Sequence, residues 1–234
     1  MAARVVTTTT NDSPALRGLT GTQRAVVALR EGIFSGRYVP GQRLVETDLV
    51  NELGVGRNSL REAFSRLASE GLVVVEPHRG ASVRRRSRTE VGQLYDISEV
   101  LEGLAAREAA QNIGKPGNVE LLIACTERQG EAVAVGVHRQ IDEAANFHEA
   151  ILRIADNPRL TELCTNLHIL TFSFQLRHAQ LTGAHPLSGH SLNEHREVAD
   201  AIRTGDPQHA EDVMRRHIRN GKQRLMALPD IAFA

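Results

Sequence analysis

The sequence predicts a mainly α-helical protein in two parts: three short helices with a two-stranded turn, then an all-α bundle of six or seven helices. Apolar residues recur at helical spacing early in the chain, and a β-branched run with a turn follows them directly. After Arg88 the strand signals nearly vanish. With 234 residues, of which 41% are apolar, the chain is long enough for two ordinary domains.

Composition excludes several classes of protein. The chain has no apolar stretch long enough to span a membrane, and its first residues lack the apolar core of a signal peptide. Its two cysteines, Cys125 and Cys164, form neither a disulfide framework nor a CxxC pair. We therefore expect a soluble cytoplasmic protein without a membrane partner.

The net charge of zero hides an asymmetry between the two parts. Residues 1–90 hold 14 arginines and 9 acidic residues, a balance of +5, and the remainder balances at −5. A basic part joined to an acidic part indicates that the first meets a polyanion.

The elements of the first part follow in order. Residues 1–18 are rich in Thr, Ser and Asn without a period, which predicts a mobile tail. Helical spacing covers residues 22–34, "VETDLVNELG" is a second helix ended by Gly54, and "NSLREAFSRLASEG" a third ended by Gly71. "LVVVE", "PHRG" and "ASVRRR" then read as strand, turn and strand. This order over residues 19–86 predicts a winged helix-turn-helix.

The third helix separates an apolar face from a face that carries two arginines. A helix set at an angle by a tight glycine turn fits the DNA major groove, with its N-terminal residues nearest the base edges. The planar guanidinium fork suits guanine O6 and N7. The alternative is a solvated face that touches no nucleic acid, and the complete order of elements favours DNA. The candidate DNA-binding residues are Thr47, Arg57, Asn58, Ser59, Arg61, His78, Arg79 and Gly80.

The second part, residues 87–234, follows a linker, "SVRRRSRTE". Most breaks in its helical pattern contain Gly, Pro or Asn, which predicts an all-α domain. The expected helices cover about 90–114, 119–134, 139–156, 158–180, 189–204 and 207–227.

Nine of the ten histidines follow residue 130, and three of these lie on the inward stripes of different helices. These three are His148, His195 and His217. Converging in a bundle, their neutral imidazoles could bind a divalent metal such as Zn²⁺. They could equally be core histidines bonded to neighbours, because no short HxxxH pair is present. We expect the remaining six at the surface or in loops: His138, His168, His178, His185, His190 and His209.

About sixty residues of the first part resemble the DNA-binding domain of GntR-type bacterial transcription regulators. The matching motifs are "G-x-x-x-P-G-x-x-L", "L-G-V-x-R", "L-R-E-A", "R-L-x-x-E-G-L" and "R-G-x-x-V". The resemblance implies that Arg57 and Arg61 read bases or phosphates and that Gly80 marks the wing tip. The family's Ser-Arg-Thr-Pro is Gly56-Arg57-Asn58-Ser59 here, so Gly56 or Asn58 must cap the third helix.

About 140 residues of the second part resemble the all-helical FCD effector domain of the FadR-like branch. The matching stretches are "LYDISEVLEGLAAREAA", "NFHEAILRIADNPRL" and "EHREVADAIRTGDPQHAEDVMRRHI". In many members one aspartate and three histidines hold a metal, and a small carboxylate completes its coordination. The resemblance makes His148, His195 and His217 the three histidine ligands.

Two positions depart from that pattern. The aspartate four residues before the first histidine is Ala144, and Asp142 lies about 120° further round a helix, which makes it a poor substitute. Ser98 stands where the family commonly has an arginine. Ser98 and Ala144 therefore join the three histidines as candidate effector-binding residues. Without the aspartate the ion's charge is less compensated, and a carboxylate effector relies more on the metal.

The resemblance implies a homodimer that reads a near-palindromic operator in double-stranded DNA. A small-molecule effector, expected to be a carboxylate, relieves repression, with residues 84–90 carrying the coupling. One rival is a zinc hydrolase using three histidines, but Glu149 and Glu194, which adjoin two of them, point about 100° away and no nucleophile motif is present. Another rival is an architectural DNA-binding protein whose helical domain only dimerises.

Overall fold

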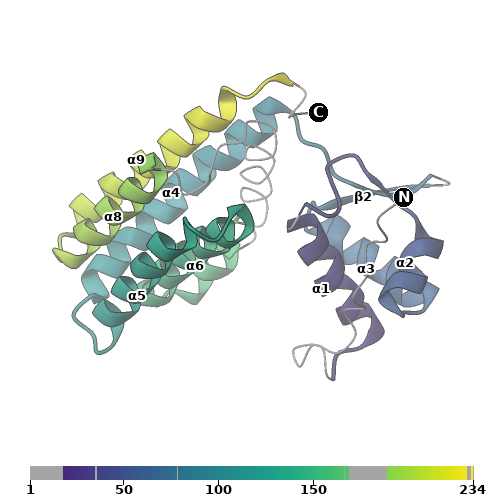
Figure 1. The fold of residues 1–234 in the computed structure, drawn as a ribbon, viewed down its shortest axis with the longest axis horizontal. Coiled ribbons are helices and arrows are strands. Elements are labelled where there is room, and N and C mark those ends of the chain that lie inside the picture. The colour runs from purple at the N-terminus through teal and green to yellow at the C-terminus, as the bar shows by residue number, and fades with distance from the viewer. Residues whose placement is uncertain are drawn as a thin grey trace. The chain divides into compact units, whose positions relative to one another are not determined.

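The computed structural model describes residues 18–34, 36–77, 79–165, 167–168, 189–230 and 233. The chain divides into two compact units, Met1–Arg85 and Arg86–Ala234, which Figure 1 shows in one colour scale from purple to yellow. Of the residues singled out above, His78, His178 and His185 and the side chain of His138 lie outside the described residues.

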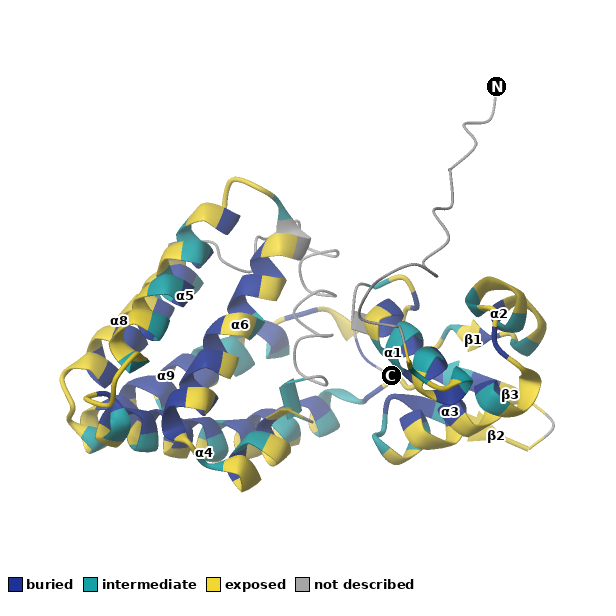
Figure 2. Cartoon of the chain, turned by 90° about the horizontal axis from the view of Figure 1, so that it is seen from below, coloured by how far each residue is buried: buried dark blue, intermediate teal, exposed yellow. Residues whose placement is uncertain are grey.

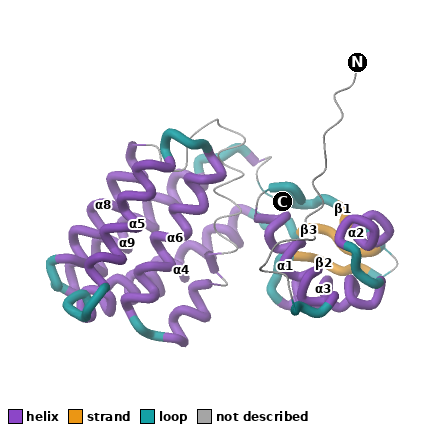
Figure 3. The backbone as a smooth tube through the Cα atoms, turned by 60° about the horizontal axis from the view of Figure 1, so that its bottom comes forward, coloured by secondary structure: helices purple, strands orange, loops and turns teal. Residues whose placement is uncertain are grey.

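The first unit is a winged helix-turn-helix. Its sheet is antiparallel with the strand order β1-β3-β2, and Figure 3 shows the three helices gathered around the short strands. The third strand, β1, extends the predicted two-stranded wing. Two residues among glycines and a proline are too short to show strand alternation in the sequence. The elements are α1 (Gly21–Phe34), β1 (Arg43–Leu44), α2 (Glu46–Leu53), α3 (Arg57–Ser69), β2 (Val73–Glu76) and β3 (Gly80–Val83).

The turn between α2 and α3 depends on two glycines. Gly54 ends α2 in the left-handed region, with φ 61° and ψ 39°, and its N–H donates to the carbonyl oxygen of Val50 at 3.1 Å. Gly56 is the N-cap of α3 in an extended conformation, and its carbonyl accepts from the N–H of Leu60 at 3.0 Å. Of the two caps considered, Gly56 holds the position, without a side chain to bond the free N–H groups.

The second unit is an all-helical bundle, as predicted. Figure 1 shows α9 running along α4, and these two helices pack against each other over much of their length. None of the described helices combines the length and low charge that crossing a bilayer requires. The helices are α4 (Arg88–Asn112), α5 (Asn118–Ala132), α6 (Val137–Ala155), α8 (Gly189–Arg203) and α9 (Pro207–Met226), and residues 158–165 and 167–168 are also helical.

The connection between the units is shorter than the sequence predicts. Ser82 and Val83 belong to β3, and α4 already begins at Arg88. Ser87 caps α4 in a capping box: its hydroxyl accepts from the N–H of Glu90, whose carboxylate accepts from the N–H of Ser87 at 2.9 Å. Only residues 84–87 therefore remain between the last strand and the first helix of the bundle.

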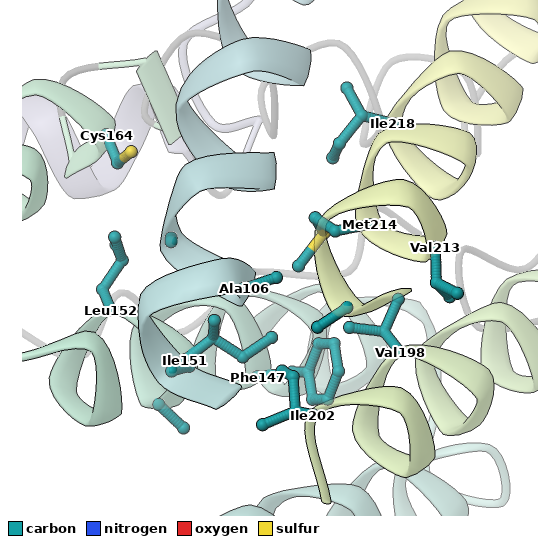
Figure 4. Packing of buried hydrophobic residues seen from close by; sticks show 14 of the residues in the cluster. Ala106, Phe147, Ile151, Leu152, Cys164, Val198, Ile202, Val213, Met214 and Ile218 are labelled. Carbon is teal, nitrogen blue, oxygen red and sulfur yellow. The ribbon is translucent and has the colours of Figure 1, made fainter. Parts of the chain in front are cut away.

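The core of the bundle is built from the inward stripes that the sequence predicts. Figure 2 shows buried residues along one side of the helices and exposed residues along the other. In Figure 4 the ring of Phe147 lies among aliphatic side chains of α6 and α8, including Ile151, Val198 and Ile202. The same ring stacks on the imidazole of His195 at a centroid distance of 4.6 Å. The apolar core therefore continues directly into a histidine-bearing site.

Candidate functional site

The exposed side of α3 carries the residues predicted to read DNA. Arg57 and Asn58 are its first two residues, and both are exposed, as is Arg61 one turn later. Ser59 differs, because a Cβ placed on Gly21 of α1 would lie 3.0 Å from the Ser59 hydroxyl. The Ser59 side chain therefore faces α1, and Arg57, Asn58 and Arg61 remain for a duplex.

Arg61 does not stand alone on this surface. Its Nε lies 3.0 and 3.2 Å from the two carboxylate oxygens of Glu46 in α2, and this hydrogen bond raises the pKa of Arg61. Thr47, also exposed in the first turn of α2, bonds its neighbour Asp48 at 3.3 Å. The sequence offered only a weak signal for Glu46, since an acidic residue in the first turn of a helix is common.

The wing has an exposed basic residue beside a glycine in the left-handed region. Arg79 is 83% exposed in its side chain, and its Nη1 lies 3.4 Å from a carboxylate oxygen of Glu76. Gly80 has φ +85°, and a Cβ there would meet nothing within 4 Å. Arg79 is therefore exposed on the wing beside its partner Glu76, where its guanidinium could reach a groove or a phosphate.

The bundle brings the three predicted histidines together. His148 of α6, His195 of α8 and His217 of α9 are 4%, 2% and 8% exposed. Their ligand atoms all lie within 4.8 Å of one another, and Nε2 of His195 lies 3.2 Å from Nε2 of His217. The inward stripes of three separate helices thus converge on one buried point.

Two of these rings are held in a defined tautomer by acceptors on their Nδ1 side. Nδ1 of His217 lies 2.9 Å from a carboxylate oxygen of Glu194, and Nδ1 of His195 lies 3.1 Å from Oε1 of Gln129. The amide nitrogen of Gln129 donates to the backbone carbonyl of Glu143 at 3.1 Å, which fixes Oε1 toward the ring. Both Nδ1 atoms therefore carry the proton, and both Nε2 atoms present a lone pair.

The third ring follows the same pattern. Nδ1 of His148 contacts a carboxylate oxygen of Glu102, and the same oxygen lies 3.4 Å from Nε2 of His168. His168 was predicted at the surface or in a loop, and this prediction is wrong. It lies on a helical segment, 12% exposed, with its ring centroid 5.4 Å from that of His148. The helical segment at residues 167–168 therefore turns the side chain of His168 inward, toward Glu102.

The donor set fits a divalent metal ion. Two lone pairs facing each other at 3.2 Å repel unless a cation or a proton lies between them. Burial holds the pKa of His195 well below its usual range, which disfavours a proton on this ring. Two nitrogens each about 2.0–2.1 Å from a tetrahedral Zn²⁺ lie roughly 3.3–3.4 Å apart. His148, His195 and His217 could therefore hold such an ion.

Two carboxylates beside the rings are ionised despite their burial. Burial raises the pKa of Glu194, but hydrogen bonds from His217, Arg224 and Asn220 outweigh it and bring this pKa to about 2. Burial by itself raises the pKa of Glu102, and positive charge beside it, on His148 and His168, brings this pKa well below its usual range. Each carboxylate thus stays a hydrogen-bond acceptor at neutral pH.

The other candidate residues of the effector site are Ser98, Ala144 and the doubtful metal ligand Asp142. Ser98 of α4 is 1% exposed, and its hydroxyl has no hydrogen-bond partner among the described residues. Ala144 is 3% exposed and precedes His148 by one turn, so no carboxylate stands there. Asp142 lies on the exposed side of α6 and is not brought to the cluster.

Glu102 and Gln129 were not predicted from the sequence as part of the site. Both are polar residues on the buried stripes of their helices, α4 and α5. A signal existed for Glu102, since it continues the helical spacing from Ser98 toward buried Ala105 and Ala109. Glutamate is rarely buried without a partner, so its place on that stripe was the clue.

Protein-family models match both parts: "Bacterial regulatory proteins, gntR family" covers residues 22–83 and "FCD domain" covers residues 93–220. A "Probable D-xylose utilization operon transcriptional repressor" of Paenarthrobacter nicotinovorans is 31% identical over 188 residues, covering 80% of each chain. The "Galactonate operon transcriptional repressor" of Escherichia coli K12 is 28% identical, covering 88% of this chain and 97% of that one.

The arrangement of the elements is also found in a solved structure. E. coli McbR/YncC is 21% identical, with a TM-score of 0.77 over 88% of this chain and 97% of that one, which shows a shared fold. The two family matches cover both units, and they agree with the helix-turn-helix and the helical bundle described above. The chain therefore belongs to the GntR family of bacterial transcription regulators and carries an FCD effector domain.

Proposed function

We propose that this regulator is a cytoplasmic homodimeric repressor, released from its operator by a small carboxylate that binds at the histidine cluster together with a divalent metal. The observation that carries the proposal is the convergence of ring nitrogens from three buried histidines inside the effector domain, two of them Nε2 atoms 3.2 Å apart. Two relatives are named as repressors of operons, and one of these operons is named for galactonate, a carboxylate.

The DNA contact is assigned to α3 and the wing. Arg57 and Arg61 lie one turn apart on an exposed face, where a guanidinium reaches base edges or phosphates. Arg79 and Gly80 at the wing reach the neighbouring groove. Two such heads related by a twofold axis read a near-palindromic operator.

The homodimer is supported by an exposed apolar stripe on α4. Ile97, Val100 and Leu104 are 51%, 51% and 37% exposed, and their spacing places them on one face of the helix. A contiguous apolar patch on a soluble protein marks an interaction surface. We assign it to a second copy of the chain, since two such stripes related by a twofold axis near Val100 would set Ile97 of each copy opposite Leu104 of the other.

The residues that would hold the ion are His148, His195 and His217, which leaves coordination positions for an effector. When bound, the ion supplies positive charge and open positions for a carboxylate oxygen. Glu194 and Gln129 hold the rings of His217 and His195 in the ligating orientation. The effector then relies on the cluster for its charge, since residue 98 is a serine.

The geometry favours binding over hydrolysis. Glu102 and Glu194 both face Nδ1 atoms, on the side of each ring away from the converging Nε2 atoms. A general base must reach the water that it deprotonates. These two carboxylates instead orient the imidazoles, as the supports of a binding site do.

The experiment couples the two sites. The purified protein is heated with a panel of small acids and sugars, with Zn²⁺ or with a chelator, and each compound that raises the melting temperature is added to the protein bound to operator DNA. We expect one of the carboxylates to raise the melting temperature only when Zn²⁺ is present. This carboxylate should lower the affinity of the protein for DNA, and DNA should lower the affinity of the protein for the carboxylate by the same factor. If no acid changes either quantity, the proposed effector mechanism is wrong.

A further inference from the structure

We propose that Glu102 is the charge-compensating carboxylate of the metal site, acting through His148 in place of the aspartate that Ala144 does not provide. The inference rests on the proposed metal binding and adds to it a residue outside the three histidine ligands. Glu102 is a positioning residue on α4, a different helix from the one that carries Ala144 and His148.

The position of Glu102 beside His148 supports this role. The carboxylate of Glu102 is 5% exposed and contacts the Nδ1 side of His148. In metal sites a ligating histidine commonly donates its other ring N–H to a carboxylate, which fixes the ring and makes its free nitrogen more basic. The contact therefore directs Nε2 of His148 toward His195 and His217.

The charge balance around Glu102 also supports this role. The other two buried glutamates of the described chain each have two arginine partners. Glu143 pairs with Arg128 and Arg139, at 3.2 and 2.6 Å. Glu211 pairs with Arg107 and Arg215, at 3.1 and 2.7 Å. The carboxylates of Glu143 and Glu211 are thus each matched by permanent cations.

Glu102 differs from these two glutamates within the described residues. Its ion-pair partners there are two histidines, His148 and His168, which are neutral when they are unprotonated. A buried anion without a cation is costly. Glu194 cannot share this role fully, because its two oxygens each lie 2.9 Å from the guanidinium of Arg224. A divalent ion among the three histidines would supply the positive charge that the described partners of Glu102 do not provide when they are neutral.

The test is Glu102→Gln in the full-length protein. The amide keeps the shape and an acceptor oxygen for His148 but removes the charge. We expect affinity for Co²⁺ and Zn²⁺, measured by the visible absorption of Co²⁺ and its displacement by Zn²⁺, to fall by roughly 10–100-fold. The melting temperature of the metal-free variant should equal or exceed that of the metal-free parent, because an uncompensated buried charge is gone.

Glu211→Gln is the matched control, since it changes a buried glutamate that bonds arginines instead of histidines. It should lower the melting temperature of the metal-free protein and leave its affinity for Co²⁺ unchanged. Equal metal affinity in Glu102→Gln and parent overturns the inference while the proposed function stands. A metal-free Glu102→Gln that melts well below the parent assigns Glu102 a structural role and also overturns it. If the parent itself binds no ion, the proposed metal site fails and the inference fails with it.

Discussion

At the scale of single residues, the exposed arginines of α3 differ in the face from which they project. Arg57 and Arg61 lie one turn apart, whereas Arg66 lies on another side of the helix and pairs with Glu62 at 2.6 Å. Replacing an arginine that contacts a base should therefore lower the affinity for the operator more than replacing an arginine that does not.

We expect Arg57→Ala and Arg61→Ala each to cost roughly 1–3 kcal/mol of operator affinity, the range for a good bidentate contact to guanine. Arg66→Ala removes the same charge and should cost much less. Fluorescence anisotropy with a specific and a scrambled duplex measures the difference. If all three variants lose the same affinity for both duplexes, α3 does not read sequence through these residues.

Glu194 provides a pH-dependent test of the cluster. Its folded pKa of about 2 lies below the ordinary value of 4.5, so its ionised form stabilises the fold above pH 4.5 and this stabilisation is lost as the pH falls toward 2. The free energy of unfolding of the parent minus that of Glu194→Gln should therefore shrink over this range, as urea unfolding with a chelator present would measure. Glu197→Gln, on the exposed side of the same helix, controls for the substitution. A difference that stays constant down to pH 2 would contradict the assigned contacts.

The residue scale also shows where sequence reasoning stops. The helical stripes placed His148, His195 and His217 on inward faces, and the structure brings them together. The roles of Glu102 and His168 were not predicted, because their partners lie on other helices. Glu102 and His148 are 46 residues apart in the chain, and Glu102 and His168 are 66 residues apart. Local periodicity predicts which side of a helix is buried and does not predict what a buried polar group meets there.

At the scale of elements, the angle between α2 and α3 is set by the glycine in the left-handed region. The Cβ of most residues costs roughly 1–2 kcal/mol in this conformation, whereas asparagine tolerates it better. Gly54→Ala should therefore lower the free energy of unfolding of the first unit by about that amount, and Gly54→Asn by less. Denaturant unfolding followed by circular dichroism measures these free energies. If both variants are as stable as the parent, a side chain at residue 54 causes no strain and the prediction is wrong.

The exposed stripe on α4 tests the dimer. Val100→Glu places two like charges near the assumed twofold axis and should give a monomer in sedimentation equilibrium. Val135→Glu, in the turn after α5 and 72% exposed, is the matched control and should remain dimeric. If Val100→Glu is still a dimer, the dimer interface does not include this stripe on α4.

At the scale of the whole molecule, the order of elements was the most predictable feature. Five predicted helices of the bundle, α4, α5, α6, α8 and α9, begin and end within a few residues of the observed ones, because capping residues and glycines are local signals. The end of the helix predicted over residues 158–180 lies outside the described residues. The exception in the first unit is β1, whose two residues pair with β3 and carry no pattern of their own. Long-range pairing decides such short strands, and the sequence alone does not show it.

The central claim is that the first unit reads duplex sequence and the bundle controls when it does so. The most direct measurement is selection of duplexes from a random pool by the purified full-length protein, repeated at rising salt and with the stabilising acid. The account predicts one enriched near-palindromic family whose binding weakens steeply with salt, as counterion release requires, and weakens further with the acid. No enrichment over random competitor DNA under any of these conditions would contradict it.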